Sequence, residues 1–450
     1  MSVRETIMYR NLLKQNDALR LFICCAIMSS LGALSAQANP FHIGRFGGIQ
    51  GNGASHRSPF ATYWNPAGLV DVGLGLQLHG MLVGRQATFD RDASLNGVPD
   101  ELSNINAGLS KTTALGVVPA IAFQSGHDLG GWTLGLGIAA FVDRAGRTNW
   151  QKNFAASPMY PGAVDGPQRW SVINTELTLY NLGIGMGVEH VESGLSIGMT
   201  WFGTQTTLST VRARTVNATD DVLIEGHLAE GRILFRDGES QGYTLVLGSQ
   251  WQISNELRVG IAWQSPVTYQ IKGNSLIQFG EAEETREPAE TSIQVPQSIR
   301  SEVRVDADPS LTFRPAIVWN QWSIVKNQIA TGSRTGEILF RTPRNFKDTI
   351  EVRLGTDVHL TASQSLNLLV GYETGATPRE TFEPGLAESD NTRFGLGMTS
   401  QWSETLSTHV SFVWQAFDNV TVTDSRQKPT TNGRYTDQRQ YLTVDMEVAL

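Results

Sequence analysis

Alternation of apolar residues with polar residues or glycine runs through most of the chain, in segments about ten residues long. Residues 132–138, 195–201, 257–263, 350–360 and 393–398 each follow this pattern. The side chains of an extended strand point alternately to its two faces, so each segment presents one apolar face. No segment beyond the N-terminal region approaches 18 consecutive apolar residues, which excludes helical membrane spans. The pattern predicts an all-β protein.

The length of these segments favours a membrane barrel over a soluble sandwich, which would show the same alternation. A tilted transmembrane strand takes about ten residues. Only 17% of the residues are charged, against about 25% in soluble domains. Tryptophans gather toward the strand ends, where the aromatic girdles of a membrane barrel lie. They are Trp132, Trp201, Trp251, Trp263, Trp319 and Trp402.

Short and long connections between the predicted strands alternate along the chain. Six short and seven long connections give fourteen strands. Outer-membrane barrels have an even number of strands, short periplasmic turns and longer external loops. We therefore expect a transmembrane antiparallel β-barrel of about fourteen strands, with both termini at the end of the short turns. The short turns fall near 125–130, 189–193, 253–255, 308–310, 362–365 and 403–405, and the long connections near 89–111, 142–170, 208–240, 273–297, 327–346, 375–391 and 421–437.

The first 38 residues have the organisation of an export signal. Four basic residues lie within 1–20, an apolar run covers 21–34, and Ala36-Gln37-Ala38 has the small-residue spacing of a cleavage site. We expect cleavage after Ala38 and insertion into the outer membrane of a Gram-negative bacterium. The chain beyond Cys25 has no cysteine, which argues against a disulfide framework or a thiolate metal site.

Residues 39–73 do not alternate and are rich in glycine. Glycine permits positive φ and close approach of the backbone, while Pro66 fixes its own φ and restricts Asn65. A barrel of fourteen strands has a lumen that must hold either water or a plug. We therefore predict a signal peptide (1–38), a hatch inside the lumen (39–73) and the transmembrane barrel (74–450).

The turn Asn65-Pro66-Ala67-Gly68-Leu69, behind a glycine-rich segment, resembles the FadL/TodX family of outer-membrane transporters for long-chain fatty acids and other hydrophobic compounds. The glycine-rich strand 132–141, the run 345–348 that leads to Arg353-Leu354-Gly355, and Gly371-Tyr372-Glu373 with Pro378 beyond are also similar to the family's pattern. The resemblance implies a hatch that carries the Asn-Pro-Ala turn and a lateral opening beside a kinked third strand. The expected function is transport of hydrophobic molecules, above all long-chain fatty acids. Binding in the plugged barrel, hatch movement and lateral release into the membrane are its expected steps.

The solvation of the substrate favours such a route. About 12 kcal/mol opposes the exposure of a sixteen-carbon acyl tail to water, so a dry pocket under a movable plug serves it better than an aqueous pore. The predicted gating turn is Asn65, Pro66, Ala67 and Gly68, with a static lock as the alternative. The candidate pocket residues are Phe41, Ile43, Phe46 and Ile49 of the hatch, and Arg258, Arg314 and Arg353 of the wall. An arginine can bind a carboxylate ligand through two parallel hydrogen bonds. The alternative role of the hatch residues is to pack the plug against the wall, and the alternative role of the arginines is to form ion pairs within the lumen.

The third predicted strand, 130–142, is rich in glycine, which weakens a strand and marks bends. It is the candidate for a kink that opens the wall, unless its glycines only leave room for the hatch. In the next strand the apolar phase slips between Leu179 and Leu182, which predicts a bulge beside the opening. The candidate glycines are Gly130, Gly131, Gly135 and Gly137.

Other functional classes have weak support. The formal charge of −8 leaves no basic excess for binding nucleic acid. Gly194-Leu195-Ser196-Ile197-Gly198 matches a hydrolase nucleophile motif, but strand alternation runs straight through it. The eight histidines lack the spacing of metal ligands. We expect no catalytic residues, no cofactor and no metal.

Three other functions stay open on the sequence: a general aqueous porin, a structural or surface barrel, and an uptake channel for aromatic hydrocarbons. The expected partners are outer-membrane lipid and lipopolysaccharide, a hydrophobic small-molecule ligand and the outer-membrane assembly machinery. That machinery reads a terminal strand such as 442–450. We expect a monomer.

Overall fold

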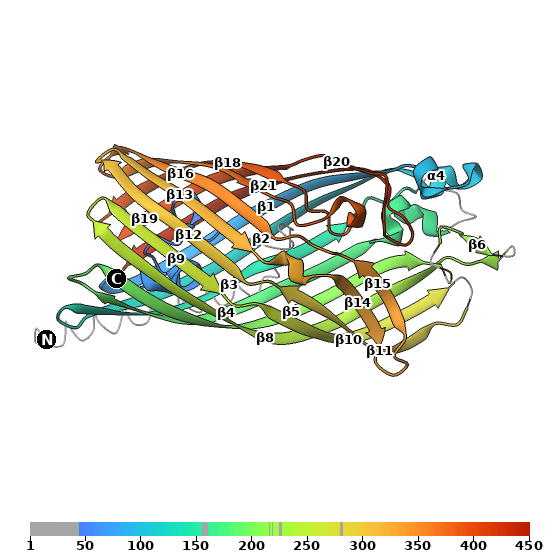
Figure 1. The fold of residues 1–450 in the computed structure, drawn as a ribbon, viewed down its shortest axis with the longest axis horizontal. Helices are drawn as coiled ribbons and strands as arrows, with labels where there is room; N and C mark the ends of the chain where they lie inside the picture. Colours follow the sequence, from blue (N-terminus) through green and yellow to red (C-terminus); the bar gives the residue numbers. More distant parts are fainter. Residues whose placement is uncertain (1–44, 155–160, 216, 218, 225–226, 280–281) are drawn as a thin grey trace, which may run out of the picture.

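The computed structural model describes residues 45–154, 161–215, 217, 219–224, 227–279 and 282–450. Within these residues the strands form one closed antiparallel barrel of fourteen strands (Figure 1). The barrel closes because β21 (Gly433–Ala449) pairs with β1 (Gly73–Arg91) along almost its whole length. The predicted fold class and strand number are confirmed.

Neighbouring strands of the wall follow one another in chain order. Some wall strands are interrupted once, so that β9 continues as β10, β11 as β12, β13 as β14, β15 as β16 and β19 as β20. The other strands are β2 (Gly108–Asp128), β3 (Trp132–Asn149), β4 (Asn174–His190), β5 (Leu195–Arg214), β6 (Leu223–Ile224), β7 (His227–Leu228), β8 (Gly231–Ser254), β9 (Leu257–Gln264), β10 (Val267–Phe279), β11 (Thr285–Val295), β12 (Ser298–Asp308), β13 (Leu311–Asn320), β14 (Asn327–Gly332), β15 (Ile338–Pro343), β16 (Thr349–Thr361), β17 (Gln364–Glu373), β18 (Asn391–Ser403), β19 (Leu406–Phe417) and β20 (Val420–Val422). The helices are α2 (Gly48–Gly51), α3 (Ala61–Trp64) and α4 (Ser103–Asn106), with short 3-10 turns η1 (Pro66–Gly68), η2 (Ser94–Asn96), η3 (Asp100–Leu102), η4 (Pro161–Asp165), η5 (Pro167–Trp170), η6 (Trp322–Ile324) and η7 (Arg379–Thr381).

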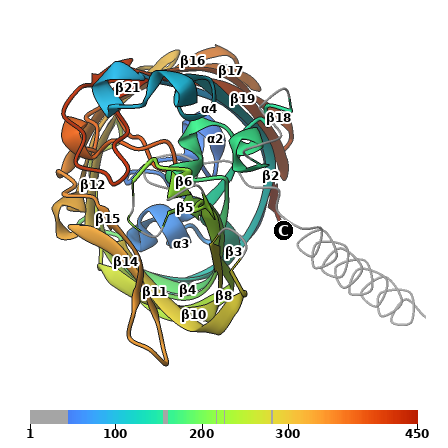
Figure 2. The same ribbon diagram turned by 90° about the vertical axis from the view of Figure 1, so that its right-hand side faces the viewer.

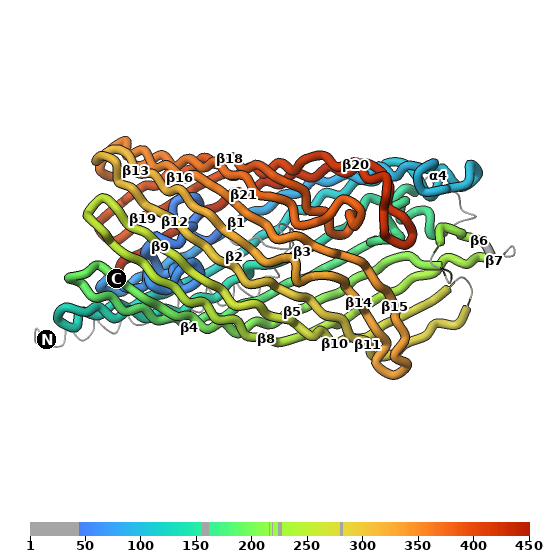
Figure 3. Tube along the Cα trace, in the orientation of Figure 1, coloured from blue at the N-terminus to red at the C-terminus, as the bar shows by residue number. Residues whose placement is uncertain are grey.

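Short turns gather at the end of the barrel where β1 begins and β21 ends, as predicted. At the other end, two of the predicted long connections, 273–297 and 327–346, were wrong. β10 continues to Phe279 and β11 begins at Thr285, while β14 and β15 form a hairpin that projects from the barrel (Figure 3). β14 and β15 have only six residues each, too few to show a clear alternation in the sequence.

The outer surface of the barrel carries the apolar face of the alternating strands. Leu182, Ile184 and Met186 of β4 and Ile197 of β5 are each about half exposed. In the outer membrane such side chains contact lipid instead of water. No helix within the described ranges is long and apolar enough to cross a membrane.

Residues 45–72, which we call the hatch segment, lie inside the ring of strands (Figure 2). Its first helix, α2, packs against β17, β18 and β19, while η1 packs against β4, β5 and β8 on another side of the lumen. All of these contacts are in the half of the barrel that ends in short turns. The periplasmic half of the lumen is therefore filled by the chain's own N-terminal region.

Candidate functional site

The external half of the lumen carries apolar side chains on its inner wall, where barrels of this kind ordinarily carry polar ones. Leu177 and Leu179 point inward from β4, although Tyr180 and Leu182 of the same strand face outward. The prediction of a bulge in β4 was therefore wrong. The alternation of inward and outward side chains is regular, and the inward-facing residues are apolar in this part of the strand. We call this group the apolar lumen cluster, which comprises Leu177, Leu179, Leu208, Phe235, Tyr269, Ile271, Ala289, Ile293, Val295, Ala330, Leu339 and Phe340.

An aromatic cluster lies below it, where the hatch segment meets the wall. The ring centroids of Phe46 and Tyr63 lie 4.7 Å and 5.0 Å from that of Phe141 on β3. Phe141 in turn lies 5.5 Å from Phe202 on β5. Each such pair contributes about 0.5–1.5 kcal/mol beyond the burial of area, so these aromatic contacts help to hold the hatch segment against the wall.

The Asn-Pro-Ala turn is locked by the side chain of Asn65. Its Oδ1 accepts from the backbone N–H of Ala67 at 3.2 Å, and its Nδ2 donates to the carbonyl oxygens of Ala54 at 2.6 Å and Ser249 at 3.0 Å. Asn65 thus joins two parts of the hatch segment to β8 of the wall. Glycines of the wall provide the space, since a Cβ at Gly248 would overlap the side chain of Asn65.

Wall arginines hold the hatch segment by its backbone carbonyl groups. Arg314 donates to the oxygens of Ile49 at 3.0 Å and Gln50 at 2.7 Å, and pairs with Asp357 through two hydrogen bonds. Arg353 donates to the oxygen of Asn52. The predicted ligand residues Arg314 and Arg353 are thus placed where they fasten the hatch.

The third predicted arginine, Arg258, has the same kind of contact, because it donates to the Ser55 oxygen at 3.3 Å. His56 follows directly in the hatch segment. Burial, with the nearby charges of Arg314, Arg304 and Arg258, lowers the pKa of His56 to about 3. The ring is therefore neutral at physiological pH and adds no charge to this arginine-rich side of the hatch.

Two backbone N–H groups of the hatch segment are bound by a buried cluster of histidine and aspartate. Gly47 donates to Asp445 Oδ1 at 3.1 Å, and Ile49 donates to His409 Nε2 at 3.1 Å. His79 Nδ1 lies 2.7 Å from the same Asp445 oxygen. Because Nε2 of His409 accepts, its Nδ1 carries the proton and donates to Thr399 Oγ1 at 2.9 Å. This cluster, which we call the hatch latch, holds α2 in place.

We expect the substitution His409→Leu to loosen α2. It leaves the buried Ile49 N–H without its acceptor, at a cost of about 1–3 kcal/mol, so local opening becomes about tenfold to a hundredfold more frequent. Hydrogen exchange of a peptide that covers 47–51 measures this directly. His359→Leu is the matched control, because His359 bonds Ser365 and lies near Thr312, away from the hatch. Equal exchange in both variants would show that His409 does not hold α2 in place.

A cavity lined by arginine lies between the hatch and the apolar lumen cluster. The volume of this cavity is about 40 Å³, whereas ligand pockets usually measure about 300–1,000 Å³. This cavity is therefore too small to hold a long hydrophobic ligand. We call this the arginine cavity, and its lining includes Arg45, Arg144, Arg300, Arg353, Arg393, Glu351, Trp64 and Trp322.

The wall has an unpaired window between β2 and β3. The two strands pair from Asp128 opposite Thr133 up to Ala120 opposite Phe141. Beyond that point, the next pairing among the described residues is the single bridge between Thr112 and Trp150. Phe141, Val142 and Asp143 are buried in succession, although alternation would expose one of the three. Asp143 is an extra residue opposite β4, where the register shifts between Val142 and Arg144. A bulge of this kind bends, or kinks, the strand that carries it.

The glycines predicted to form this kink lie elsewhere, and that part of the prediction was wrong. Gly130 and Gly131 form the turn before β3 with φ of 71° and 95°, and Gly135 and Gly137 lie in the fully paired part of the strand. A Cβ on Gly135 would overlap the carbonyl of Leu69. These two glycines leave room for the hatch, which was the alternative interpretation.

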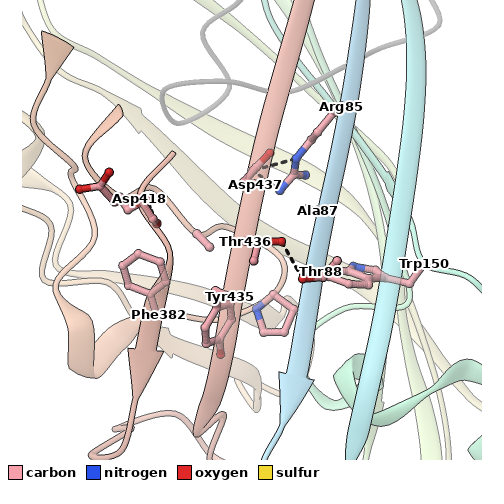
Figure 4. Close-up of a pocket in the computed structure, with 12 residues that line it drawn as sticks. Arg85, Ala87, Thr88, Trp150, Phe382, Asp418, Tyr435, Thr436 and Asp437 are labelled. Atoms are coloured by element: carbon pink, nitrogen blue, oxygen red, sulfur yellow. Dashed lines mark hydrogen bonds and ion pairs between the residues drawn. The ribbon is translucent and has the colours of Figure 1, made fainter. Parts of the chain in front are cut away.

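The external mouth of the barrel is closed by apolar side chains from two long loops. Trp150, after β3, and Phe382, in the loop after β17, pack with Phe89 and Tyr435 of the wall. Figure 4 shows the rings of Trp150, Phe382 and Tyr435 around a small pocket beside the ion pair of Arg85 with Asp437.

The predicted hatch residues divide into two groups. Phe41 and Ile43 lie outside the described residues. Phe46 is buried in the aromatic cluster, and Ile49 is buried against wall residues that include Met81 and Leu369. Sequence reasoning missed the hatch latch. The latch residues are polar positions on the inner face of strands, and nothing in their spacing sets them apart.

Comparison with known proteins gives a consistent result. A family model described as outer membrane protein transport protein (OMPP1/FadL/TodX) matches residues 48–448. No curated protein matches the chain. Among solved structures, a Pseudomonas aeruginosa FadL homologue has a TM-score of 0.75 at 14% identity, covering 91% of this chain and 99% of that one. The P. putida toluene transporter TodX has a TM-score of 0.65 at 12% identity, covering 89% and 99%. The Ralstonia pickettii toluene transporter TbuX has a TM-score of 0.61 at 15% identity, covering 92% and 99%.

Proposed function

The chain belongs to the outer membrane transport protein family that includes FadL and TodX, and from this premise we propose that it imports long-chain fatty acids. Members of the family transport hydrophobic compounds across the Gram-negative outer membrane. The proposed path begins at the external mouth, crosses the apolar lumen cluster and leaves the barrel sideways through the window between β2 and β3.

The apolar lumen cluster is the observation that carries this proposal. Its side chains come from β4, β5, β8, β10, β11, β14 and β15 and line one side of the lumen in the external half of the barrel. A lumen that passes hydrated solutes has no use for such a wall, because apolar surface next to water is unfavourable by about 25 cal/mol per Å². A hydrophobic passenger covers that surface instead. The wall thus favours the transport function over an aqueous porin.

Lateral release is the second part of the proposal. The periplasmic half of the lumen is filled by the hatch segment, and the aromatic cluster reaches Phe141 at the edge of the unpaired window. A ligand displaced from the arginine cavity meets the window before it meets the periplasm. Release into the membrane avoids the cost of about 12 kcal/mol for a sixteen-carbon tail in water.

Uptake by intact cells tests the proposal. Cells that lack their own fatty acid transporter should take up labelled palmitate when they make this protein. The double substitution Asn65→Ala, Pro66→Ala should reduce uptake at least tenfold, because the turn loses the three hydrogen bonds of Asn65. Labelled toluene is measured in parallel.

Folding of both proteins in the outer membrane is checked by heat-modifiable migration on gels. Uptake of toluene without palmitate would move the assignment to aromatic hydrocarbons. Uptake of neither from a folded barrel would contradict the proposal and favour a structural or surface role.

A further inference from the structure

The hairpin formed by β14 and β15 is part of the wall around the apolar lumen cluster. We call residues 327–343 the lid hairpin, and Figure 2, which views the barrel from its external end, shows both strands at the rim. Ala330, Leu339 and Phe340 of this hairpin belong to the cluster. Leu339 and Phe340 are both buried in it because the register between the two strands shifts at this position.

The apolar lumen cluster is packed and leaves no room for a long ligand. None of its twelve side chains is more than 8% exposed, and the pocket beside Ile293 measures about 30 Å³. Protein interiors are packed about as densely as organic crystals, so a hydrocarbon chain enters only where part of the surrounding wall moves away. The weakest attachment in that wall therefore decides where a substrate enters.

The lid hairpin has the shortest strand pairing in this wall. β14 pairs with β11 over three residue pairs, whereas β10 pairs with β11 over eleven. Within the described ranges, β15 pairs with β14 alone. Because the hydrogen bonds of a ladder add along its length, a ladder of three residues separates far more easily than one of eleven.

Side chains of β5 hold β15 in place. Arg214 donates to the carbonyl oxygen of Leu339. Arg212 donates to Thr342 Oγ1 at 3.2 Å, and its guanidinium carbon lies 4.1 Å from the ring centroid of Phe340. Along the sheet, β8, β10, β11 and β14 lie between β5 and β15. The sheet therefore curls around the apolar lumen cluster, and side chains instead of a strand ladder complete the contact.

Glu287 of β11 holds the turn at the tip of the lid hairpin. Its carboxylate accepts from the backbone N–H groups of Arg334 and Thr335, each at 3.2 Å, and from Thr335 Oγ1 at 2.9 Å. Like the bonds from β5, these bonds depend on side chains, which change rotamer without disturbing the paired strands behind them. The lid hairpin can thus leave β5 and β11 while the rest of the barrel stays intact.

Both legs of the lid hairpin lose their strand structure at the same level. Residues 321–326 connect β13 to β14, and residues 344–348 connect β15 to β16. The two legs are linked there, because Arg344 and Asn345 both donate their backbone N–H groups to the carbonyl oxygen of Lys326. A few residues at the ends of an element absorb the backbone rotation of a closing lid, so this level is the hinge.

We propose that the lid hairpin swings about this hinge and admits the hydrophobic substrate to the apolar lumen cluster from outside. The proposal rests on the transport function proposed above and adds the point of entry. A hydrocarbon chain in the cluster takes the place of Leu339 and Phe340, and the hairpin returns once the chain has moved on. A lid that closes behind the ligand keeps the apolar wall away from water, whose contact with such surface is unfavourable.

A disulfide that ties the lid hairpin to β11 tests the proposal. Glu290 and Thr331 are directly opposite in the register, and opposite residues of an antiparallel pair have the Cα spacing that a disulfide needs. The chain has no cysteine beyond Cys25, so no native thiol of the barrel competes. In the variant Glu290→Cys, Thr331→Cys, palmitate uptake should be at least tenfold lower with the disulfide formed and should recover on reduction.

The variant Thr268→Cys, Gln294→Cys is the matched control, because its disulfide joins β11 to β10. This pair lies within the ladder of eleven residue pairs, which does not have to open. Uptake by the control should therefore be the same before and after reduction. Mass spectrometry verifies that both disulfides form. Equal uptake by the oxidised and reduced forms of the Glu290→Cys, Thr331→Cys variant would overturn the role of the lid hairpin.

Hydrogen exchange of a peptide that covers 327–343 follows the hairpin in purified protein in nanodiscs. Palmitate should accelerate its exchange, because a ligand in the cluster holds the hairpin open. Without ligand, Glu287→Ala should accelerate it about tenfold, since the tip loses three hydrogen bonds. Glu290→Ala removes an exposed glutamate of the same strand and should have no such effect. Exchange that palmitate leaves unchanged would overturn the proposal, and equal exchange in the two alanine variants would show that Glu287 does not hold the tip.

Failure of this proposal differs from failure of the transport function. A folded barrel that takes up palmitate equally well with the lid hairpin locked and unlocked leaves transport intact and refutes the lid. A folded wild-type barrel that takes up neither palmitate nor toluene refutes transport, while hydrogen exchange still shows whether the hairpin opens for a ligand.

Discussion

Deletion of Asp143 will abolish uptake of the hydrophobic substrate while the barrel still assembles. Asp143 is the extra residue of the bulge in β3, and the register between β3 and β4 shifts at this point alone. Without it, the residues after Val142 return to the regular pleat. They then lie in the plane of the wall, next to the unpaired stretch of β2.

The energetics favour closure of the window in this variant. Each backbone hydrogen bond between the two strands contributes about 0.5–1.5 kcal/mol, and residues 142–149 offer several that are now absent. We expect palmitate uptake to fall more than tenfold, measured in the cells described above. Asp143→Asn keeps the backbone length and the contact with Asn181, so it should retain most of the uptake. Normal uptake by the deletion variant would show that the substrate leaves by another route.

Replacing Gly198 and Gly248 together by valine will turn the plugged barrel into a leaky one. A Cβ on Gly198 would overlap the carbonyl of Pro66 and the nitrogen of Ala67, and a Cβ on Gly248 would overlap the Asn65 side chain. The hatch turn therefore has to leave the wall, because strands of a closed barrel cannot move away. The turn then loses the hydrogen bonds of Asn65 as well.

The expected result is a steady ion conductance in planar bilayers, where the wild-type chain conducts little. Cells should also become sensitive to large antibiotics that the outer membrane excludes. Gly203→Val is the matched control on β5, since its Cβ would come no closer than 3.8 Å to another atom. If the double variant conducts as little current as the Gly203→Val control, the Asn-Pro-Ala turn does not seal the lumen.

Much of the fold was predictable because a membrane barrel repeats one simple rule. Strand residues such as Leu182 and Ile184 alternate with glycines and face lipid, so the sequence marks the wall directly. The rule ends where the membrane ends. Strands β14 and β15 were interpreted as a loop, because each has only six residues and shows no clear alternation.

The interior was harder to predict, because its chemistry depends on which strands face one another. Leu177 and Leu179 were taken as a shift of phase, when they mark an inner wall that is itself apolar. Arg314 and Arg353 resemble every other inward arginine in the sequence. Only the closed barrel shows that both have carboxylate partners and hold the hatch segment.

The hydrogen bonds from the barrel wall to the hatch segment go mainly to main-chain atoms of the hatch. Arg314, Arg353 and Arg258 bind its carbonyl oxygens, and Asp445 and His409 bind its N–H groups. Every amino acid except proline offers the same two groups. Substitutions of hatch side chains leave these main-chain hydrogen bonds in place, so the apolar surface of the hatch can change during evolution while this part of its attachment to the wall stays the same.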